Sequence, residues 1–364
     1  MNVVDLLIRL LSAPSVTPDD GGLMEFVQEY LPGYEVIRVD EGGVKNLFMV
    51  RRFGEGEHLC FAGHVDVVPP GDGWESDPFV PMIRDGMLYA RGAQDMKSGV
   101  AAFLEAMRRT EAFNGTLSLL LTSDEEGNAT YGTQIVLRRL REIGMLPDYA
   151  IVAEPTCEER FGDAVKIGRR GSINGRLTVH GRQGHAAYPE KSDNPIHRIA
   201  PVLPRIAGVD LDEGDAHFAP SKLVITDIRA GMEVTNVTPG ELKMMFNLRN
   251  STKTTKENLE RFVRDALEGL DYDLSLNQTA KPFVTDPDTR IVRLLDAAIE
   301  AETGLRPKHS TAGGTSDARF FGEYGVKVVE IGPRNDTIHA PNERVAIEEV
   351  EGLFRVFRRV IENF

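Results

Sequence analysis

The sequence predicts an α/β protein whose mixed sheet is flanked by helices, with a smaller α+β domain of ferredoxin-like order inserted into it. Short apolar strand runs alternate with helical runs at both ends of the chain, which is typical of an α/β domain. The middle of the chain instead orders its elements β-α-β-β-α-β, a self-sufficient unit of about 110 residues. We therefore expect residues 1–170 and 283–364 to form the larger domain and residues 171–282 the inserted one.

In the first part of the chain, runs of apolar and β-branched residues predict the strands. Residues 59–68 (LCFAGHVDVV) form one strand, which Pro69 and Pro70 end. Further strands are expected at 115–123 and 149–154, and helices at 1–11, 97–110 and 131–143. These strands carry a His or an acidic residue toward their carboxyl ends, which is where ligands bind in open α/β sheets.

In the inserted domain, the pattern predicts strands at 175–180, 223–229, 241–248 and 272–278, and helices at 195–206 and 256–267. The α/β pattern then returns with a helix at 289–303, a loop at 311–317, a strand at 326–331 and a closing helix at 347–362. This return is the reason for treating the middle domain as an insertion.

Composition excludes several classes of protein. The 56 acidic residues outnumber the 42 Lys and Arg, and no basic run occurs, so nucleic acid is not an expected partner. Cys60 and Cys157 are the only cysteines, which excludes a disulfide framework and a thiolate metal site. No apolar run approaches the roughly 18 residues of a membrane span, and the amino terminus lacks a signal-peptide pattern. We expect a cytoplasmic protein without membrane association.

Polar residues with metal-binding chemistry end apolar strands or lie in Gly-rich turns. They are His64, Asp66, Asp95, Glu125, Glu126, Glu154 and His339. Each alone has an ordinary structural interpretation: a hydrogen-bonded His, a solvated acidic turn, or an N-cap in the case of Asp95. Together, two His and several carboxylates without a thiolate favour zinc, with cobalt or manganese as substitutes.

Spacing within two of these motifs suggests a division of roles. Residues two apart in a strand share a face, so Asp66 is expected to hold the ring of His64. Glu125 and Glu126 are adjacent, so one can bind metal while the other faces substrate.

The order of GHVDVVP, RGAQDMKSG, SDEEG, AEP and IHAPNE resembles the dinuclear zinc aminoacylase and carboxypeptidase family across nearly the whole chain. The resemblance implies a zinc-peptidase-like catalytic domain that binds two Zn²⁺ per subunit and hydrolyses the amide of a small N-acyl amino acid. It implies that Asp95 bridges the two ions, that His64 and Glu154 complete one site, and that Glu126 and His339 complete the other.

The same resemblance implies that Glu125 is the general base and that the inserted domain forms a homodimer. It further implies that His185 reaches into the neighbouring subunit's site and donates to the oxyanion there. The alternative for His185 is a surface histidine in a Gly-containing turn.

Residues for substrate binding are expected in Gly- or Pro-flanked loops and at strand ends. They are Arg169, Ser172, Tyr188, Asn236, Arg249, Gly314, Thr315 and Asn335. By the resemblance, Arg169 and Arg249 contact substrate carboxylates. The tight turn at residues 313–315 offers backbone amides suited to another carboxylate, with an ordinary loop before a helix around 317–321 as the alternative. For any one Arg the alternative is a solvated surface charge. The identity of the acyl amino acid stays open. A second alternative is that the protein is a non-catalytic, metal-binding relative that has kept the fold.

Overall fold

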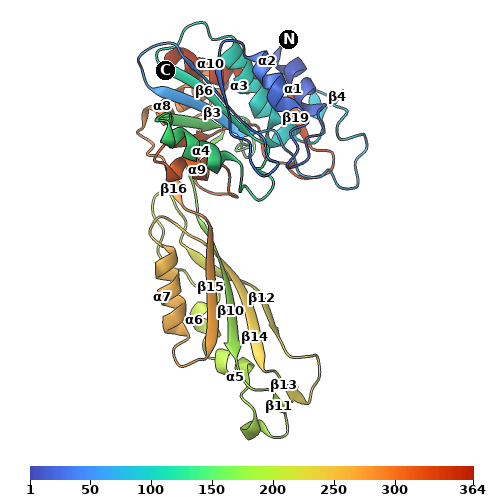
Figure 1. The fold of residues 1–364 in the computed structure, drawn as a ribbon, viewed down its shortest axis with the longest axis vertical. Helices are drawn as coiled ribbons and strands as arrows, with labels where there is room; N and C mark the ends of the chain where they lie inside the picture. The colour runs from blue at the N-terminus through green and yellow to red at the C-terminus, as the bar shows by residue number, and fades with distance from the viewer. The chain divides into compact units, whose positions relative to one another are not determined.

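The computed structural model describes residues 1–364 and divides them into two compact units (Figure 1). Unit 1 comprises Met1–Gly168, Val284–Ser310 and Ser316–Phe364. Unit 2 comprises Arg169–Phe283 and Thr311–Thr315. The short strands β9 (Gly168–Arg169) and β16 (Phe283–Val284) lie where the chain passes from one unit to the other. No helix is both long enough and apolar enough to cross a bilayer.

Unit 1 contains a mixed eight-stranded sheet in the order β1-β2-β6-β3-β7-β18-β8-β17, which confirms the predicted α/β class. Its strands are β1 (Glu35–Arg38), β2 (Asn46–Arg52), β3 (His58–His64), β6 (Thr116–Thr122), β7 (Tyr149–Val152), β8 (Ala164–Lys166), β17 (Lys308–Ser310) and β18 (Lys327–Glu330). The four central strands β6, β3, β7 and β18 run parallel to one another. They are almost wholly buried, as expected of parallel strands covered on both faces.

Helices cover this sheet on both faces (Figure 1). They are α1 (Val3–Leu11), α2 (Leu23–Tyr30), α3 (Ser98–Arg108), α4 (Thr133–Glu142), α8 (Arg290–Thr303), α9 (Ala318–Glu323) and α10 (Ile347–Asn363). Helix α3 packs on α1 and α10, while α4 packs on α9. The rings of Phe61, Phe103 and Phe357 meet at centroid distances of 5.1–6.5 Å and join β3 to α3 and α10.

One glycine lets a helix approach the sheet closely beside the site described below. A Cβ on Gly99, in the first turn of α3, would lie 2.3 Å from the carbonyl oxygen of Ala153. Only glycine therefore allows the start of α3 to lie against the residue that follows β7 and precedes Glu154.

Unit 2 has the predicted β-α-β-β-α-β order, with a four-stranded antiparallel sheet arranged β12-β14-β10-β15. Its elements are β10 (Ser172–His180), α5 (Pro195–Ile199), α6 (Leu203–Ile206), β12 (Lys222–Ala230), β14 (Glu241–Arg249), α7 (Lys256–Ala266) and β15 (Tyr272–Ala280). One face of the sheet packs with the helices into a core that includes Leu177, Phe246 and Val263. Along each strand, side chains alternate between this buried face and the opposite, more exposed face of the sheet, as in β14.

Several elements differ from the sequence prediction. The helix expected at 195–206 is broken into α5 and α6, because Pro201 lies between them and has no amide hydrogen to continue the helix. The strand expected at 59–68 ends at His64, and the amide of Val67 then bonds the carbonyl of Ser15.

The pattern did not indicate the shortest elements. The longer α2, β1 and β2 were not indicated either. The short elements are β8, β9, β16 and β17, the three-stranded sheet of β4 (Met82–Arg84), β5 (Met87–Tyr89) and β19 (Arg344–Ala346), the pair β11 (Gly184–His185) and β13 (Val237–Thr238), and the turns Ala93–Lys97 and Pro189–Lys191. Strands of two or three residues are too short to show periodicity.

Candidate metal centre and substrate-binding residues

Three parallel neighbouring strands bring acidic and imidazole side chains to one edge of the sheet in unit 1. His64 is the last residue of β3, Glu125 and Glu126 follow β6, and Glu154 follows β7. The carboxyl ends of parallel strands meet at the same edge, so these side chains converge. Asp95, in the turn Ala93–Lys97, and His339, in the loop after β18, complete the cluster.

Asp95 lies between the two histidines, with one carboxylate oxygen toward each. His64 Nε2 is 3.2 Å from Asp95 Oδ1, and His339 Nε2 is 3.4 Å from Asp95 Oδ2. His64 Nε2 is also 3.7 Å from Glu154 Oε1, and His339 Nε2 is 3.0 Å from Glu126 Oε1. The cluster thus has two halves that share Asp95, which is the arrangement a bridging carboxylate requires.

The donor atoms are close enough to hold metal ions. His64, Glu125 and Glu154 offer one ligand atom each within 4.8 Å of one another, and so do His64, Asp95 and Glu126. The sets contain imidazole nitrogen and carboxylate oxygen without thiolate, which suits zinc and similar divalent ions. Glu125, expected as a base rather than a ligand, is also near enough to contribute.

The histidines of the cluster are surrounded by negative charge. Burial disfavours a charged His64, but its hydrogen bond to Asp95 and the charge of Glu154 outweigh burial and raise its pKa well above the usual value. Hydrogen bonds to Asp95 and Glu126 raise the pKa of His339 to about 10. Burial opposes ionisation of Asp95, yet its hydrogen bonds with His339 and His64 lower its pKa below the usual value.

The carboxylates also repel one another. Burial, together with the charges of Asp317, Asp95 and Glu126, raises the pKa of Glu125 to about 8. Burial and the charge of Asp95 raise the pKa of Glu154 well above its usual value. A buried group of acids with this much repulsion requires positive charge, and a divalent cation supplies it in place of protons. The residues therefore fit a metal centre.

Asp66 contacts the cluster differently from the prediction. His64 Nδ1 donates to the backbone carbonyl of Asp66 at 2.8 Å, while the Asp66 carboxylate lies further away, at 3.7 Å. The carboxylate instead accepts from the amides of Glu125 at 3.4 Å and Glu126 at 3.1 Å. The reason is that β3 ends at His64, so the two residues do not share a strand face. Because Nδ1 of His64 bonds the carbonyl of Asp66, the other ring nitrogen, Nε2, faces Asp95 and Glu154.

Three buried polar residues that the sequence did not single out surround the turn that carries Asp95. They are Arg91, Gln94 and Glu343, and all three are at most 2% exposed. In the sequence they could be noticed only because they lie within the motifs RGAQD and IHAPNE. Their contacts could not be predicted, because they join segments about 250 residues apart.

Candidate anion-binding residues gather at one end of the sheet in unit 2. Ser172 begins β10 and Arg249 ends the neighbouring antiparallel β14. Arg169 precedes β10, and its Nη1 donates to the carbonyl of Gly314 at 3.2 Å. Arg249 has no acid within 4.0 Å, and burial and the nearby Arg170 guanidinium lower its pKa from the usual value. Arg249 therefore gives this end of unit 2 a positive charge without an ion-pair partner.

The loop that contains Gly314 and Thr315 belongs to the same unit. Gly313 has a φ of +106°, a backbone conformation that residues with a side chain rarely adopt, so glycine is favoured at this position of the loop.

The other candidates of unit 2 lie at the opposite end of its sheet. His185 in β11 pairs with Val237 in β13, and the amide of Ala186 donates to the carbonyl of Asn236 at 2.9 Å. Tyr188 lies beside His185, with ring centroids 5.7 Å apart, and is 52% exposed. The nine residues of β10 separate the two ends, and the eight steps from its first to its last residue span about 27 Å at roughly 3.4 Å per step. The structure therefore does not bring these three residues to Arg169 and Arg249 within unit 2.

Asn335 is in unit 1 and lies close to the metal cluster. Its amide nitrogen Nδ2 donates to the carbonyl of Pro155 at 3.4 Å, and its backbone amide donates to the carbonyl of Cys157 at 2.9 Å. Asn335 is thus fixed against the segment that follows Glu154.

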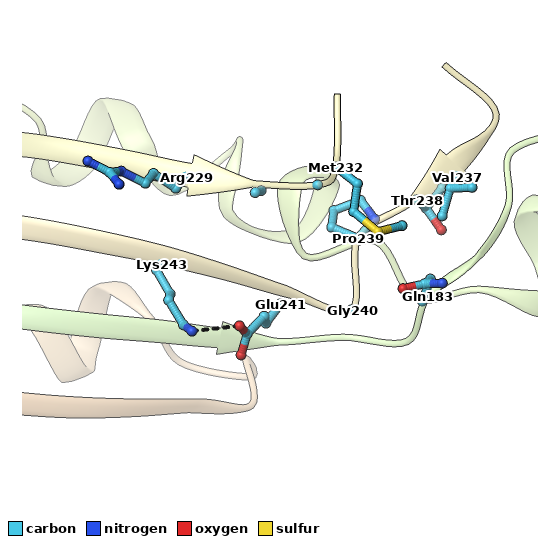
Figure 2. A pocket seen from close by; sticks show the side chains of 11 residues that line it. Gln183, Arg229, Met232, Val237, Thr238, Pro239, Gly240, Glu241 and Lys243 are labelled. Atoms are coloured by element: carbon cyan, nitrogen blue, oxygen red, sulfur yellow. Dashed lines mark ion pairs between the residues drawn. The ribbon is translucent and has the colours of Figure 1, made fainter. Parts of the chain in front are cut away.

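A cavity of about 290 Å³ lies beside the β11–β13 pair (Figure 2). Its lining includes Gln183, Met232 and Val237 but none of the predicted site residues. Its charged side chains are paired: Lys243 with Glu241 at 2.7 Å, and Arg229 with Asp227 at 2.8 Å. We assign it no ligand.

Comparison with known proteins agrees with this geometry. The model of peptidase family M20/M25/M40 matches residues 60–363. Proteins named succinyl-diaminopimelate desuccinylase from a Nitratiruptor species and a Sulfurovum species are 66% and 65% identical over 364 residues, which cover all of this chain and 100% and 99% of theirs.

Among solved structures, the M20 family metallo-carboxypeptidase Sso-CP2 from Sulfolobus solfataricus is 16% identical, with a TM-score of 0.79 and coverage of 100% of this chain and 99% of that one. The aminopeptidase PepT from Bacillus cereus is 19% identical, with a TM-score of 0.82 and coverage of 99% and 97%. These two structures share the fold. Since the family model matches most of the chain and the donor set fits a metal ion, the chain belongs to peptidase family M20/M25/M40 and is a metal-dependent hydrolase.

Proposed function

We propose that this protein hydrolyses the amide bond of N-succinyl-LL-2,6-diaminopimelate, giving succinate and LL-2,6-diaminopimelate, a step of lysine and diaminopimelate biosynthesis. One geometric observation carries the hydrolytic chemistry: the two oxygens of Asp95 face His64 and His339, at 3.2 and 3.4 Å. The choice of substrate is supported by relatives named succinyl-diaminopimelate desuccinylase, which are 55–66% identical over 98–100% of the chain.

We propose that the cluster binds two Zn²⁺ ions per subunit, with Co²⁺ or Mn²⁺ as substitutes; its imidazole and carboxylate donors support this. His64, Asp95 and Glu154 would hold one ion, and Asp95, Glu126 and His339 the other. When bound, such ions act as Lewis acids that lower the pKa of water and polarise a carbonyl group.

Glu125 is the proposed general base. Its carboxylate takes a proton from the attacking water and passes it to the nitrogen of the leaving amine. A carboxylate oxygen of Glu125 lies within 4.8 Å of ligand atoms of His64 and Glu154, and this proximity to the cluster supports the role. Asp66 supports Glu125 indirectly, because its carboxylate accepts from the amides of Glu125 and Glu126 and so fixes their backbone.

The substrate carries three carboxylates, and an acidic protein needs local positive charge to bind them. Arg169 and Arg249 are the proposed carboxylate ligands, with Ser172 and the backbone of Gly314 and Thr315 beside them. The absence of an acidic partner within 4.0 Å of Arg249 supports this role. In unit 1, Asn335 is proposed to contact the substrate near Glu154.

We further propose a homodimer in which His185, Tyr188 and Asn236 serve the partner's site. The reason is distance: the length of β10 separates them from Arg169 and Arg249, and one small substrate does not bridge that length. His185 would then donate to the oxyanion formed in the neighbouring subunit. A cytoplasmic location agrees with two buried, unpaired cysteines.

The experiment is a substrate panel with zinc-loaded protein: N-succinyl-LL-diaminopimelate, its N-acetyl analogue, N-acetylornithine and a set of N-acyl amino acids. We expect kcat/KM to be highest for the succinyl compound. A preference for N-acetylornithine or for acyl amino acids in general would instead identify an acetylornithine deacetylase or an aminoacylase with the same metal centre. Tight zinc binding without cleavage of any amide would point to a non-catalytic relative.

A further inference from the structure

A buried ion pair lies directly behind the metal cluster. Arg91 Nη1 donates to Glu343 Oε2 at 2.7 Å, and the two residues are 1% and 0% exposed. Neither residue is a candidate ligand, and neither has a role in the proposed chemistry. A buried ion pair is costly to desolvate and gives little net stability, so its presence calls for another explanation.

The Glu343 carboxylate is saturated by the backbone of the turn that carries Asp95. Oε2 accepts from the amide of Gly92 at 3.0 Å, and Oε1 accepts from the amides of Gln94 at 2.8 Å and Asp95 at 3.0 Å. One side chain therefore fixes three amides of an irregular turn in which Asp95 departs from helical dihedral angles.

The same ion pair also holds the segment that carries His339. Arg91 Nη2 donates to the carbonyl of His339 at 3.3 Å and to that of Pro70 at 3.0 Å. His339 has a φ of +60°, a backbone conformation that non-glycine residues adopt only when their surroundings fix it. Gln94 adds a second connection, because its Oε1 accepts from the amide of Thr337 at 2.8 Å.

We propose that Glu343 is a positioning residue of the metal centre. Through Arg91 and the amides of residues 92–95, its carboxylate sets the position of Asp95 relative to His339, so that both oxygens of Asp95 face an imidazole. The proposal rests on the proposed function only in that it takes Asp95 and His339 as metal ligands. Residues that orient ligands in this way typically change metal affinity by about 10- to 100-fold when they are replaced.

The alternative is a structural role only, in which the ion pair joins two segments and metal binding is indifferent to it. The two roles predict different results for the unfolding temperature and for metal affinity. A structural role lowers the unfolding temperature of the metal-free protein, whereas a positioning role also changes metal affinity and the geometry of the bound ion.

The test variant is Glu343→Gln, which keeps the size and one acceptor oxygen but presents an NH₂ group to Arg91 or to the backbone amides. The matched control is Glu105→Gln on α3, another buried carboxylate, bonded to Tyr30 and Arg109. For each metal-free protein, Co²⁺ affinity is measured by competition with a chelator, the visible spectrum of the Co²⁺-loaded protein is recorded, and the unfolding temperature is taken without metal.

We expect Glu343→Gln to weaken Co²⁺ binding about 10- to 100-fold and to alter the cobalt spectrum. Glu105→Gln is expected to keep wild-type affinity and spectrum even where its unfolding temperature falls by as much. Wild-type cobalt affinity and spectrum in a folded Glu343→Gln protein would overturn the proposal.

If Glu343→Gln does not fold, Arg91→Lys replaces it, because that variant keeps a positive charge beside Glu343 but loses the Nη2 bonds to the carbonyls of His339 and Pro70. Weaker Co²⁺ binding in folded Arg91→Lys supports the proposal, and unchanged binding overturns it. The outcomes also separate this proposal from the proposed function. Wild-type protein that binds Co²⁺ but leaves N-succinyl-LL-diaminopimelate intact contradicts the function alone, whereas active wild type with an unaffected Glu343→Gln centre contradicts the positioning role alone.

Discussion

Asp95 lies between the two histidines of the candidate metal centre, and the proposed function divides its neighbours into metal ligands and a general base. The cluster contains more carboxylates than two ions need, and Glu125 lies within ligand distance of His64 and Glu154. Glu125 could therefore act as a base or as a metal ligand, and the substitution Glu125→Gln distinguishes the two roles.

Replacing Glu125 by Gln is expected to lower kcat by about 10²- to 10⁴-fold, because the side chain can no longer accept the proton of water. Zinc affinity is expected to stay within a few-fold of wild type. Both quantities are measured, kcat with saturating substrate and affinity by chelator competition. A large loss of zinc affinity would make Glu125 a ligand and contradict its role as base.

Replacing Arg249 by Ala is expected to raise KM, since a charge-assisted hydrogen bond to a carboxylate is lost. A bond of this kind contributes about 1.5–3 kcal/mol, which corresponds to a loss of about 10- to 100-fold in kcat/KM. Arg176→Ala is the matched control, because Arg176 is an exposed arginine on β10 of the same sheet. Equal effects of the two substitutions, or an unchanged KM for Arg249→Ala, would remove Arg249 from the substrate site.

The candidate ligands could be predicted from the sequence because their chemistry is restricted to a few residue types and their positions follow apolar strands. His64 and Glu154 illustrate this: each stands at or just after the end of a buried parallel strand. Glu343 could not be predicted, because its partners are backbone amides about 250 residues earlier in the chain. The contact of Asp66 was predicted with the wrong atom, since the end of β3 decides which group faces His64.

Among the secondary-structure elements, the central strands of unit 1 determine where the site forms. The central strands could be predicted because they are continuous apolar and β-branched runs, and most of the longer helices because their apolar residues recur with the helical period. Helix α2 and strands β1 and β2 were not predicted. The sheet of β4, β5 and β19 could not, because β19 pairs with a strand more than 250 residues away. The break between α5 and α6 follows from Pro201, whose local effect outweighed the helical pattern around it.

Strand β3 also carries a titratable group away from the cluster. His58 begins the strand, its Nε2 lies 2.7 Å from Ser118 Oγ, and its ring packs edge-on against Phe48. Burial lowers its pKa to about 4, against the opposing charge of Asp148. The unfolded chain, with a His pKa near 6.5, therefore binds a proton before the folded chain does.

The contribution of neutral His58 to stability is fully present above about pH 6.5 and is lost as the pH falls toward 4. The full pKa difference corresponds to about 3 kcal/mol, and partial exposure of the ring reduces this to roughly 1–2 kcal/mol. His58→Gln is expected to flatten the fall in unfolding free energy between pH 6.5 and 4, as measured by urea denaturation. His180→Gln, at a half-buried position at the end of β10, serves as the control. Parallel pH profiles for wild type and His58→Gln would contradict this assignment.

For the whole chain, the division into two units separates two kinds of residue. The metal cluster and Asn335 belong to unit 1, and the arginines and His185 belong to unit 2. The sequence predicted two domains because the element order changes from an α/β alternation to β-α-β-β-α-β. It gave no indication that residues Thr311–Thr315 group with unit 2, because a five-residue loop has no pattern of its own.

The proposed exchange of His185 between subunits is tested by mixing two inactive variants, Glu125→Gln and His185→Ala. After dissociation and reassociation, half of the dimers are mixed, and one site in each has both groups, so about a quarter of wild-type activity is expected. His185→Ala paired with a second copy of itself is the control and is expected to stay inactive. An inactive mixture of variants that do form mixed dimers would place His185 in its own subunit's site, and an active His185→Ala protein would remove His185 from the reaction.

The most direct measurement is hydrolysis of N-succinyl-LL-diaminopimelate by metal-stripped protein during titration with Zn²⁺, with cleavage of the amide bond as the signal. We predict no activity without metal and a rise that is complete between one and two equivalents of zinc per chain. Zinc binding at this stoichiometry with the succinyl amide left intact, while another N-acyl amino acid is cleaved, would preserve the metal centre and contradict the proposed substrate.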